Sequence, residues 1–251
     1  AGTVDITPAA ITITAASGVS KVYDASTTAS GSAIVQGGAA TTVFGDTLSG
    51  GVFSYDNKNV GTGKAVSVSG VTITDGTTGG IANSNYTISY ADANVGTITK
   101  ANLVVTGLSA NDKVYDGSTA ATVGGTAVVS ALGSDVVTLN GTPTATFADK
   151  NVARDANTGD YTAKAVSVTG YTLASGGDND NYTLVQPQGL MATITPATAT
   201  ISGVTVATRD YDTTTSASVT NYGTAQGVQV SGVNETLTLV TSDVTAAFAD
   251  K

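Results

Sequence analysis

A set of short markers returns along the sequence about every 95 residues, and this repeat restricts the chain to a string of similar modules. The marker Lys-Val-Tyr-Asp at 21–24 returns at 113–116 and, as Arg-Asp-Tyr-Asp, at 209–212. Four further markers keep the same order: Ile-Thr-(Pro/Lys)-Ala at 6–9, 98–101 and 194–197; Lys-Ala-Val-Ser-Val at 64–68 and 164–168; Asn-Tyr-Thr at 85–87 and 181–183; Phe-Ala-Asp-Lys at 147–150 and 248–251, with a looser copy at 53–58. This period suits a small independent domain rather than a solenoid rung.

The markers divide the chain. Residues 1–7 match the last strand of a preceding module, residues 8–100 form module 1, and residues 101–196 form module 2. Residues 197–251 form an incomplete module 3 that lacks the Lys-Ala-Val-Ser-Val and Asn-Tyr-Thr markers. With no signal-peptide pattern at its start, the sequence is expected to be a mature or cut fragment of a protein that continues in both directions. Junctions without Gly/Ser spacers predict an elongated, semi-rigid rod.

Composition indicates an all-β fold. The sequence is rich in Thr, Val, Ala, Gly and Ser, has a single Glu, and is poor in Leu, Lys, Met and Gln, which favour helices. Short apolar stretches alternate with turn dipeptides such as Asp-Gly and Asn-Gly. About seven strands in each module predict a β-sandwich-like module. The alternative is a β-grasp-like mixed sheet with one short helix, placed after 115–117.

Composition also excludes several classes of function. The sequence contains no His and no Cys, which excludes imidazole-based triads, thiol nucleophiles, structural zinc sites and disulfides. A net charge of −9 without a basic cluster argues against nucleic-acid binding. No apolar run approaches the ~18 residues of a membrane helix. We therefore expect neither an enzyme nor a membrane-spanning protein.

The markers resemble a known family. The run Asn-Asp-Lys-Val-Tyr-Asp-Gly-Ser-Thr-Ala-Ala at 111–121 is similar to the signature of the YDG-type repeat of bacterial surface proteins, and the segments at 147–152, 181–184 and 194–197 match further elements of that repeat in order. Ala25 and Thr213 stand where the family has Gly, which argues against a tight turn there. The resemblance implies a secreted or cell-surface adhesin of the filamentous-haemagglutinin-like, two-partner secretion class, in which the repeats serve as stalk or spacer. It brings no catalytic residues.

The repeated tyrosines and aspartates are the structural motif of the module. We expect the rings to pack in the core or on a sheet with each hydroxyl reaching a partner, and the carboxylates to accept hydrogen bonds within turns. Lys21, Lys113 and Arg209 place a positive charge two residues before each tyrosine, which predicts an ion pair. The motif residues are Tyr23, Asp24, Tyr115, Asp116, Tyr211 and Asp212.

The Asp-Lys pairs at 149–150 and 250–251 predict capped turns or ion pairs. The alternative is an intramolecular isopeptide bond, which joins a buried Lys to an Asn beside a carboxylate. Lys58 or Lys150 with Asn85 or Asn181 would be the partners.

One loop has the composition of a calcium site. Asp178, Asp180 and Asn181 follow two glycines and place oxygen ligands on a Gly-rich loop, as Ca²⁺ prefers. The loop lacks the spaced ligands and distal Glu of an EF-hand, so a solvated loop is the alternative. Asp155 and Asp160, in a segment special to module 2, would add ligands if that segment folds back. No other cofactor is expected.

Four Asn-x-Thr sequons are candidate glycosylation sites. Two of them also lie where a strand begins, and a role in the turn explains them equally well. The four are Asn85, Asn140, Asn181 and Asn234.

The sequence leads to one main hypothesis of function and two alternatives. The chain is predicted to be a stalk segment of a bacterial adhesin that extends a distal binding region and contributes to adhesion or biofilm matrix. Its partners would be neighbouring modules of the same long chain, with host or matrix glycans bound by other regions. The first alternative is a module that binds a glycan or Ca²⁺ through the loops at 154–162 and 176–181. The second is homotypic association, in which another chain supplies the strands that module 3 lacks.

Overall fold

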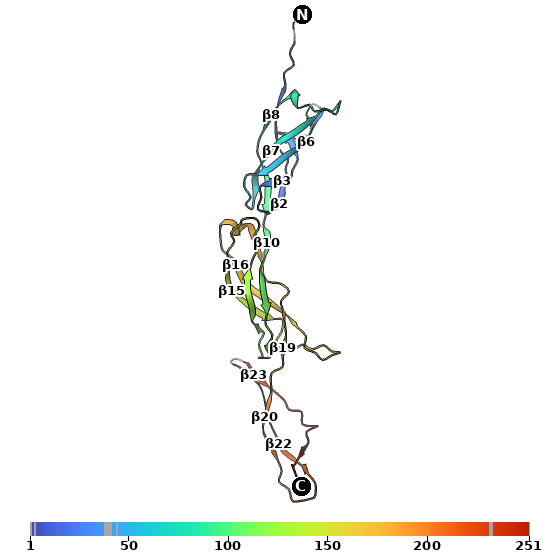
Figure 1. The fold of residues 1–251 in the computed structure, drawn as a ribbon, viewed down its shortest axis with the longest axis vertical. Helices are drawn as coiled ribbons and strands as arrows, with labels where there is room; N and C mark the ends of the chain where they lie inside the picture. Colours follow the sequence, from blue (N-terminus) through green and yellow to red (C-terminus); the bar gives the residue numbers. More distant parts are fainter. Residues whose placement is uncertain (1, 3, 38–41, 44, 231–232, 251) are drawn as a thin grey trace. The chain divides into compact units, whose positions relative to one another are not determined.

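The structure, a computed structural model, describes residues 1–251 except 1, 3, 38–41, 44, 231–232 and 251 (Figure 1). Side chains of 42, 43, 229, 230, 233, 234 and 236 are also outside the described part. Apart from two short 3₁₀ turns, η1 (Asn83–Asn85) and η2 (Gly177–Asn181), the regular structure of the described residues is all strand. The all-β expectation is therefore confirmed. No helix of the described chain is long and apolar enough to cross a membrane.

Module 1 is built from two mixed sheets. In the smaller sheet, β1 (Ala9–Ala15) lies between β4 (Ala33–Val35), which is antiparallel to it, and β8 (Tyr86–Tyr90), which is parallel. The larger sheet has the order β2-β9-β7-β6-β3, with β5 also paired to β6. Its strands are β2 (Ser20–Val22), β9 (Ala93–Thr99), β7 (Gly61–Thr74), β6 (Asp46–Tyr55), β3 (Thr28–Ala29) and β5 (Thr42–Val43).

Module 2 repeats these pairings. The parallel pair β10 (Ala101–Val104) and β17 (Tyr182–Val185) corresponds to β1 and β8. A second parallel pair, β12 (Lys113–Val114) with β19 (Ile194–Thr195), corresponds to β2 and β9. The other strands are β11 (Thr106–Ala110) paired with β14 (Val123–Val128), and a sheet of β13 (Ala120–Ala121), β15 (Leu139–Phe147), β16 (Lys164–Leu173) and β18 (Met191–Ala192).

The short helix of the β-grasp alternative is absent from its expected place. The residues after Tyr115 to Gly117 form a bend followed by β13, which pairs antiparallel with β15. The reason is local: Asp116 Oδ1 accepts hydrogen bonds from the backbone N–H and the hydroxyl of Ser118, which fixes a turn where a helix would start.

Fewer strands are found among the described residues of module 3. A three-stranded sheet joins β20 (Thr200–Val206), β22 (Val219–Val230) and β23 (Val233–Thr236). The short strands β21 (Ser216–Ala217) and β24 (Ala246–Ala247) pair with each other, as β13 pairs with β15 in module 2. The seven residues of β20 are exposed.

A kink in the β6–β7 hairpin lets one pair of strands cover the core along its whole length. Val66 and Val68 are buried, and then the buried set changes phase to Val71 and Ile73. Gly70 lies between them at φ 64°, in the left-handed region that glycine adopts without strain. Gly170 of β16 repeats this with φ 98°. In β7 the glycine lets the strand turn its alternate residues to the same core on both sides of the kink.

The main hydrophobic core continues across the boundary between modules 1 and 2. It contains Ile13, Ile73 and Ile98 of module 1 and, in the same cluster, Leu103 and Tyr182 of module 2. Each such side chain contributes about 1.5–3 kcal/mol through burial. A second cluster lies elsewhere in module 2, around Phe147, Val166, Ala192 and Ile194.

Two compact units follow from these contacts. Unit 1 comprises residues 1–105, 128–141 and 171–185, which is module 1 with one end of module 2. Unit 2 comprises residues 106–127, 142–170 and 186–251, which is the other end of module 2 with module 3. Each compact unit therefore contains a junction between two sequence repeats.

Candidate functional site: carboxylate clasps at the module junctions

Within unit 1, one carboxylate of module 2 accepts hydrogen bonds from two side chains of module 1. Asp135 Oδ2 accepts a hydrogen bond of 2.6 Å from the Tyr23 hydroxyl, and Asp135 Oδ1 accepts one from Lys58 Nζ. The Tyr182 hydroxyl, from module 2 itself, also donates to Asp135 Oδ2 at 2.7 Å. The Asp135 side chain is 0% exposed. We call Tyr23, Lys58, Asp135, Asp178 and Tyr182 the Asp135 clasp.

Regular structure positions both tyrosines. Tyr23 directly follows β2, and its backbone N–H donates to Thr99 O at 2.8 Å, which continues the parallel pairing of β2 with β9. Tyr182 begins β17, opposite Ala101 of β10. The two rings meet edge to face, with centroids 5.4 Å apart and planes at 79°. This geometry is favourable for aromatic pairs and aims both hydroxyls at one carboxylate.

The lysine of the clasp lies in the turn between β6 and β7. Asn57 Oδ1 accepts hydrogen bonds from the Asn59 N–H at 3.0 Å and from Lys64 Nζ at 2.7 Å, which fixes the turn on either side of Lys58. Lys58 Nζ also lies 3.1 Å from Asp178 Oδ1. Since Asp178 is in module 2, Lys58 pairs with two carboxylates across the repeat boundary.

The electrostatics of the clasp favour a charged Asp135. Burial opposes ionisation, but the hydrogen bonds from Lys58, Tyr23 and Tyr182 outweigh it, so the pKa of Asp135 lies below its usual value. Burial and the hydrogen bond to Asp135 together raise the pKa of Tyr182 to about 12. Hydrogen bonds to Asp135 and Asp178 raise the pKa of Lys58. The group is thus a phenol–carboxylate–ammonium cluster that stays intact at neutral pH.

A buried amide completes this junction. Asn181 is 2% exposed, and its Oδ1 accepts a hydrogen bond of 2.9 Å from the backbone N–H of Val60 in module 1. Its Nδ2 donates to Asn59 Oδ1 at 3.2 Å. Both capacities of the amide are therefore used across the repeat boundary, as a buried polar side chain requires.

Unit 2 contains a second clasp with the corresponding residues. The Tyr115 hydroxyl donates to Glu235 Oε1, and Lys150 Nζ donates to the same oxygen at 2.6 Å. Tyr115 and Lys150 each lie 92 residues after their counterparts, Tyr23 and Lys58. Hydrogen bonds from Lys150 and Tyr115 lower the pKa of Glu235. We call Tyr115, Lys150 and Glu235 the Glu235 clasp.

Module 1 contains a third contact between a tyrosine hydroxyl and a carboxylate. The Tyr86 hydroxyl donates to Asp46 Oδ2 at 2.8 Å, as Tyr182 donates to Asp135. Asn85 occupies the place of Asn181 before that tyrosine and is exposed. The carboxylate-and-tyrosine half of the clasp is therefore repeated in both complete modules.

The Lys-x-Tyr-Asp marker forms a fixed loop beside each clasp. Lys21 Nζ donates to Asp24 Oδ1 at 2.6 Å and to Ser26 O at 2.8 Å, and it lies 5.4 Å from the centroid of the Tyr55 ring. In module 2, Lys113 makes the same contacts with Asp116, Ser118 and the Phe147 ring. In module 3, Arg209 pairs with Asp212 and lies over the Phe248 ring. Tyr211 of that module is 74% exposed.

The turn of this marker is kept even without glycine. Gly117 has φ 76°, and the residues at its place in the other modules, Ala25 and Thr213, have φ 62° and 69°. The expectation that these substitutions argue against a tight turn is therefore wrong. Both residues adopt the left-handed conformation because the adjacent Asp accepts hydrogen bonds from Ser26 or Thr214.

The candidate calcium ligands have separate partners. Asp178 Oδ2 accepts from the Val136 N–H at 3.0 Å, and Asp180 Oδ1 accepts from the Gly176 N–H at 3.2 Å. Asn181 is turned to Val60 as described. Asp155 and Asp160 belong to unit 2, whereas Asp178 belongs to unit 1. In the part of the chain that is described, no three acidic side chains gather as a metal site would require, and calcium stays a prediction.

The sequons differ in accessibility. Asn85 and Asn140 are exposed, and Asn181 is buried, so a glycan on Asn181 would displace its contact with Val60. The side chain of Asn234 is outside the described residues. The lysines of the isopeptide alternative pair with carboxylates: Lys58 with Asp135 and Asp178, and Lys150 with Glu235. Lys251 is outside the described residues.

The carboxylates Asp135 and Glu235 are the site residues that sequence reasoning missed. They differ in type, and they lie at different distances after the marker tyrosine of their own module: Asp135 is 20 residues after Tyr115, and Glu235 is 24 residues after Tyr211. The available signal was Glu235 itself, the one Glu in the sequence, together with the 92-residue repeat of Lys58 and Lys150.

The fold and the clasps define an all-β protein of tandem modules that are tied to each other by repeated side chains. The YDG domain family matches residues 7–95 and again residues 98–189, which together make up most of the sequence. The chain belongs to the YDG domain family. No curated protein and no solved structure matches the chain.

Proposed function

We propose that this chain is a spacer segment of a secreted or surface-attached bacterial adhesin, whose modules extend a distal binding region away from the cell and contribute to adhesion or biofilm matrix. The observation that carries the proposal is the recurrence of the clasp. Tyr23 with Lys58, and Tyr115 with Lys150, each hold a carboxylate of the following module. Side-chain contacts across a junction resist relative motion of successive modules, and this resistance is what a mechanical spacer needs.

The surface and composition agree with this role. Only 12% of residues are charged, and the sequence has few basic residues at which trypsin-like proteases cleave. The absence of Cys makes the fold independent of the redox state of its surroundings. The proposal assigns no catalytic activity and no cofactor to the chain.

The loops of the binding alternative are occupied by contacts within the fold. Asp178 takes part in the Asp135 clasp. The segment at 154–162 forms a small hairpin, in which the Arg154 guanidinium lies 4.2 Å from the Tyr161 ring centroid and donates to the Tyr161 hydroxyl at 2.9 Å. These contacts favour a structural role for both loops, so the spacer is the better-supported proposal.

Small-angle scattering of the 251-residue chain, first with Ca²⁺ and then with a chelator, tests the proposal. We expect an elongated particle of the same maximum dimension in both conditions. Asp135→Ala should broaden the distribution of dimensions because it removes the acceptor of one junction, whereas the exposed Asp92→Asn should not change it. A compact particle in both conditions would overturn the spacer and favour the binding alternative.

A further inference from the structure

The buried apolar residues that are described form one cluster in module 1 but are divided in module 2. In module 1, Ile13 and Val68 belong to the same cluster as Ile73. Their counterparts in module 2 are Val105 and Val168, which lie 92 and 100 residues later. Both are buried, but among the described residues they belong to neither cluster. The apolar core of module 2 is therefore interrupted at a level where that of module 1 is continuous.

A smaller residue in module 2 replaces the side chain that fills this level in module 1. Phe53 is buried there, and a Cβ added at Gly31 would lie 3.3 Å from its ring. The residue 92 positions after Phe53 is Ala145. Val123, at the place of Gly31, is half-buried and smaller than the lost ring. Module 2 thus lacks the aromatic side chain around which the middle of module 1 packs.

Two glycines remove further side chains at the same level. Ala15 and Ala33 are buried in module 1 and lie opposite each other in β1 and β4. Their counterparts 92 residues later are Gly107 and Gly125, which have φ 83° and 88°. A Cβ added at Gly125 would collide with the Gly107 carbonyl, so neither position adds a side chain to the core.

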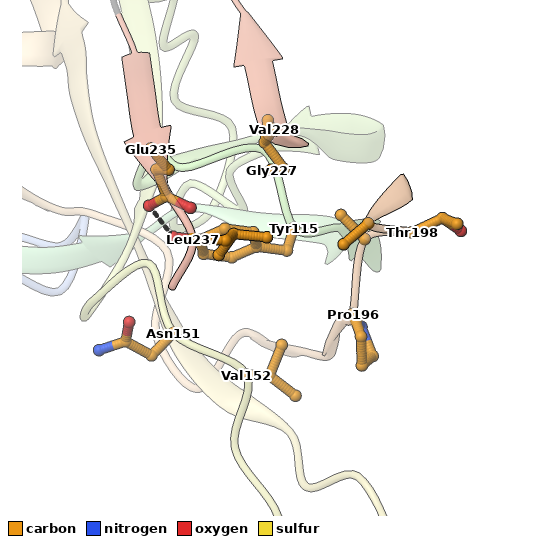
Figure 2. Close-up of a pocket in the computed structure, with 11 residues that line it drawn as sticks. Tyr115, Asn151, Val152, Pro196, Thr198, Gly227, Val228, Glu235 and Leu237 are labelled. Carbon is orange, nitrogen blue, oxygen red and sulfur yellow. Dashed lines mark hydrogen bonds between the residues drawn. The ribbon is translucent and has the colours of Figure 1, made fainter. Parts of the chain in front are cut away.

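The two clasps join the two ends of module 2 to different neighbours. Asp135 lies in unit 1 and accepts the hydrogen bond from Tyr23 of module 1. Tyr115 lies in unit 2 and donates to Glu235 of module 3. Figure 2 shows this second hydrogen bond beside an apolar hollow that Tyr115 and Val152 line, and both residues pack against the second cluster. Each end of module 2 is therefore stabilised by a module other than its own.

We propose that module 2 has no unfolding transition of its own. Residues 101–105, 128–141 and 171–185 unfold together with module 1, and residues 106–127, 142–170 and 186–196 unfold together with module 3. Residues that share a core and its hydrogen bonds open as one cooperative unit. The boundary between the cooperative units lies inside a sequence repeat, and each junction between repeats lies within a unit.

This arrangement determines what a partly unfolded chain keeps. Module 2 can lose one half of its structure while the Asp135 clasp stays closed, because the clasp is lost only when unit 1 as a whole unfolds. The junction between modules 1 and 2 is thereby protected from unfolding in the rest of module 2. The inference concerns which residues unfold together, so it does not depend on the spacer proposal.

Hydrogen exchange of the 251-residue chain with two matched substitutions tests the proposal. Ile73→Val and Ile194→Val each remove one methylene group from an isoleucine that is 0% exposed, one in each cluster. Exchange is followed by mass spectrometry in urea just below the unfolding transition, where amides exchange through the unfolding of whole units.

The two substitutions should act on different halves of module 2. Ile73→Val should speed exchange of residues 171–185 by about 2–10-fold together with module 1, as the usual effect of this change in a core implies, and should leave residues 142–170 unchanged. Ile194→Val should speed exchange of residues 142–170 and leave residues 171–185 unchanged, although all of them belong to the same repeat.

Three results would overturn the proposal. Faster exchange of residues 142–170 and 171–185 together after Ile194→Val would show that module 2 unfolds as one repeat. An effect of Ile73→Val that stops at the end of module 1 would show the same. An effect of either substitution over the whole chain would show a single cooperative unit. Scattering of the same samples records a failure of the spacer proposal separately.

Discussion

The Tyr23 hydroxyl lies 2.6 Å from Asp135 Oδ2 although the two residues are 112 positions apart in the sequence. The same carboxylate accepts a second phenol and an ammonium group, and none of it is exposed. Because Tyr23 and Lys58 recur at Tyr115 and Lys150, this contact is a feature of the repeat rather than of one junction.

Asp135→Asn should lower the free energy of unfolding of unit 1 by about 3 kcal/mol. The substitution removes the buried one of the two carboxylates that pair with Lys58 and leaves only Asp178, and breaking one side of a buried pair typically costs about 3–5 kcal/mol. We place the value at the lower end because the Lys58 side chain is 32% exposed. Urea unfolding followed by circular dichroism measures the change.

The matched control for this variant is Asp92→Asn. Asp92 is exposed, and a surface change of this kind alters stability by no more than ~0.5 kcal/mol. Equal stability of the two variants would show that the clasp contributes nothing measurable to unit 1.

At alkaline pH, unit 1 should lose stability between pH 10 and about 12. The pKa of Tyr182 rises from 10.0 to about 12 in the fold, and that of Tyr23 is also raised, by burial first and then by Asp135. A raised folded-state pKa means that the stabilisation is complete below the unfolded value and is lost as the pH rises through the folded one. The ultraviolet absorbance of tyrosinate should therefore show a late-titrating group.

The variant Asp135→Asn is the control for the tyrosine titration. Asp135→Asn removes the charge that opposes ionisation, so the late group should titrate earlier while burial still holds its pKa above the ordinary value. An unchanged titration curve would mean that Asp135 does not act on these phenols.

Ala25→Gly and Thr213→Gly should each stabilise the chain, by about 1 kcal/mol. Both residues have positive φ, a conformation that costs a non-glycine residue on the order of 1 kcal/mol. Gly117→Ala is the reverse control and should destabilise by a similar amount, since Gly117 has φ 76°. Thermal unfolding measures all three, and a loss of stability in Ala25→Gly would contradict the strained turn.

The repeat made much of the fold predictable. The markers at 21–24 and 113–116 correctly indicated equivalent loops, and the scarcity of helix-forming residues indicated strands. The looser copy of Phe-Ala-Asp-Lys begins at Phe53, but the ring that lies under Lys21 is that of Tyr55. In module 2 the ring under Lys113 is that of Phe147, the first residue of the marker. Tyr55 lies 92 residues before Phe147, which is also the spacing between Lys58 and Lys150, so Tyr55 and not Phe53 is the equivalent aromatic residue.

The clasps could not be predicted because their acceptors lie outside the markers. Asp135 is in the connection between β14 and β15, held by its N–H to Leu132 O at 3.1 Å, and Glu235 is in β23. A contact between modules depends on how one repeat packs on the next, which a marker within one repeat does not encode. Asp178 is an example: the composition of its loop predicted a Ca²⁺ ligand, whereas in the structure its carboxylate pairs with Lys58.

Asp178→Ala should lower the melting temperature by the same amount in Ca²⁺ and in chelator. The substitution removes the pairing with Lys58 and the acceptor of the Val136 N–H, and neither contact involves a metal. Asp180→Ala, which removes only an exposed turn contact with the Gly176 N–H, is the matched variant and should have a smaller effect, of about 0.5 kcal/mol or less. A melting temperature of the unaltered chain that rises with Ca²⁺, and that both substitutions make insensitive to it, would establish the calcium site and displace Asp178 from a purely structural role.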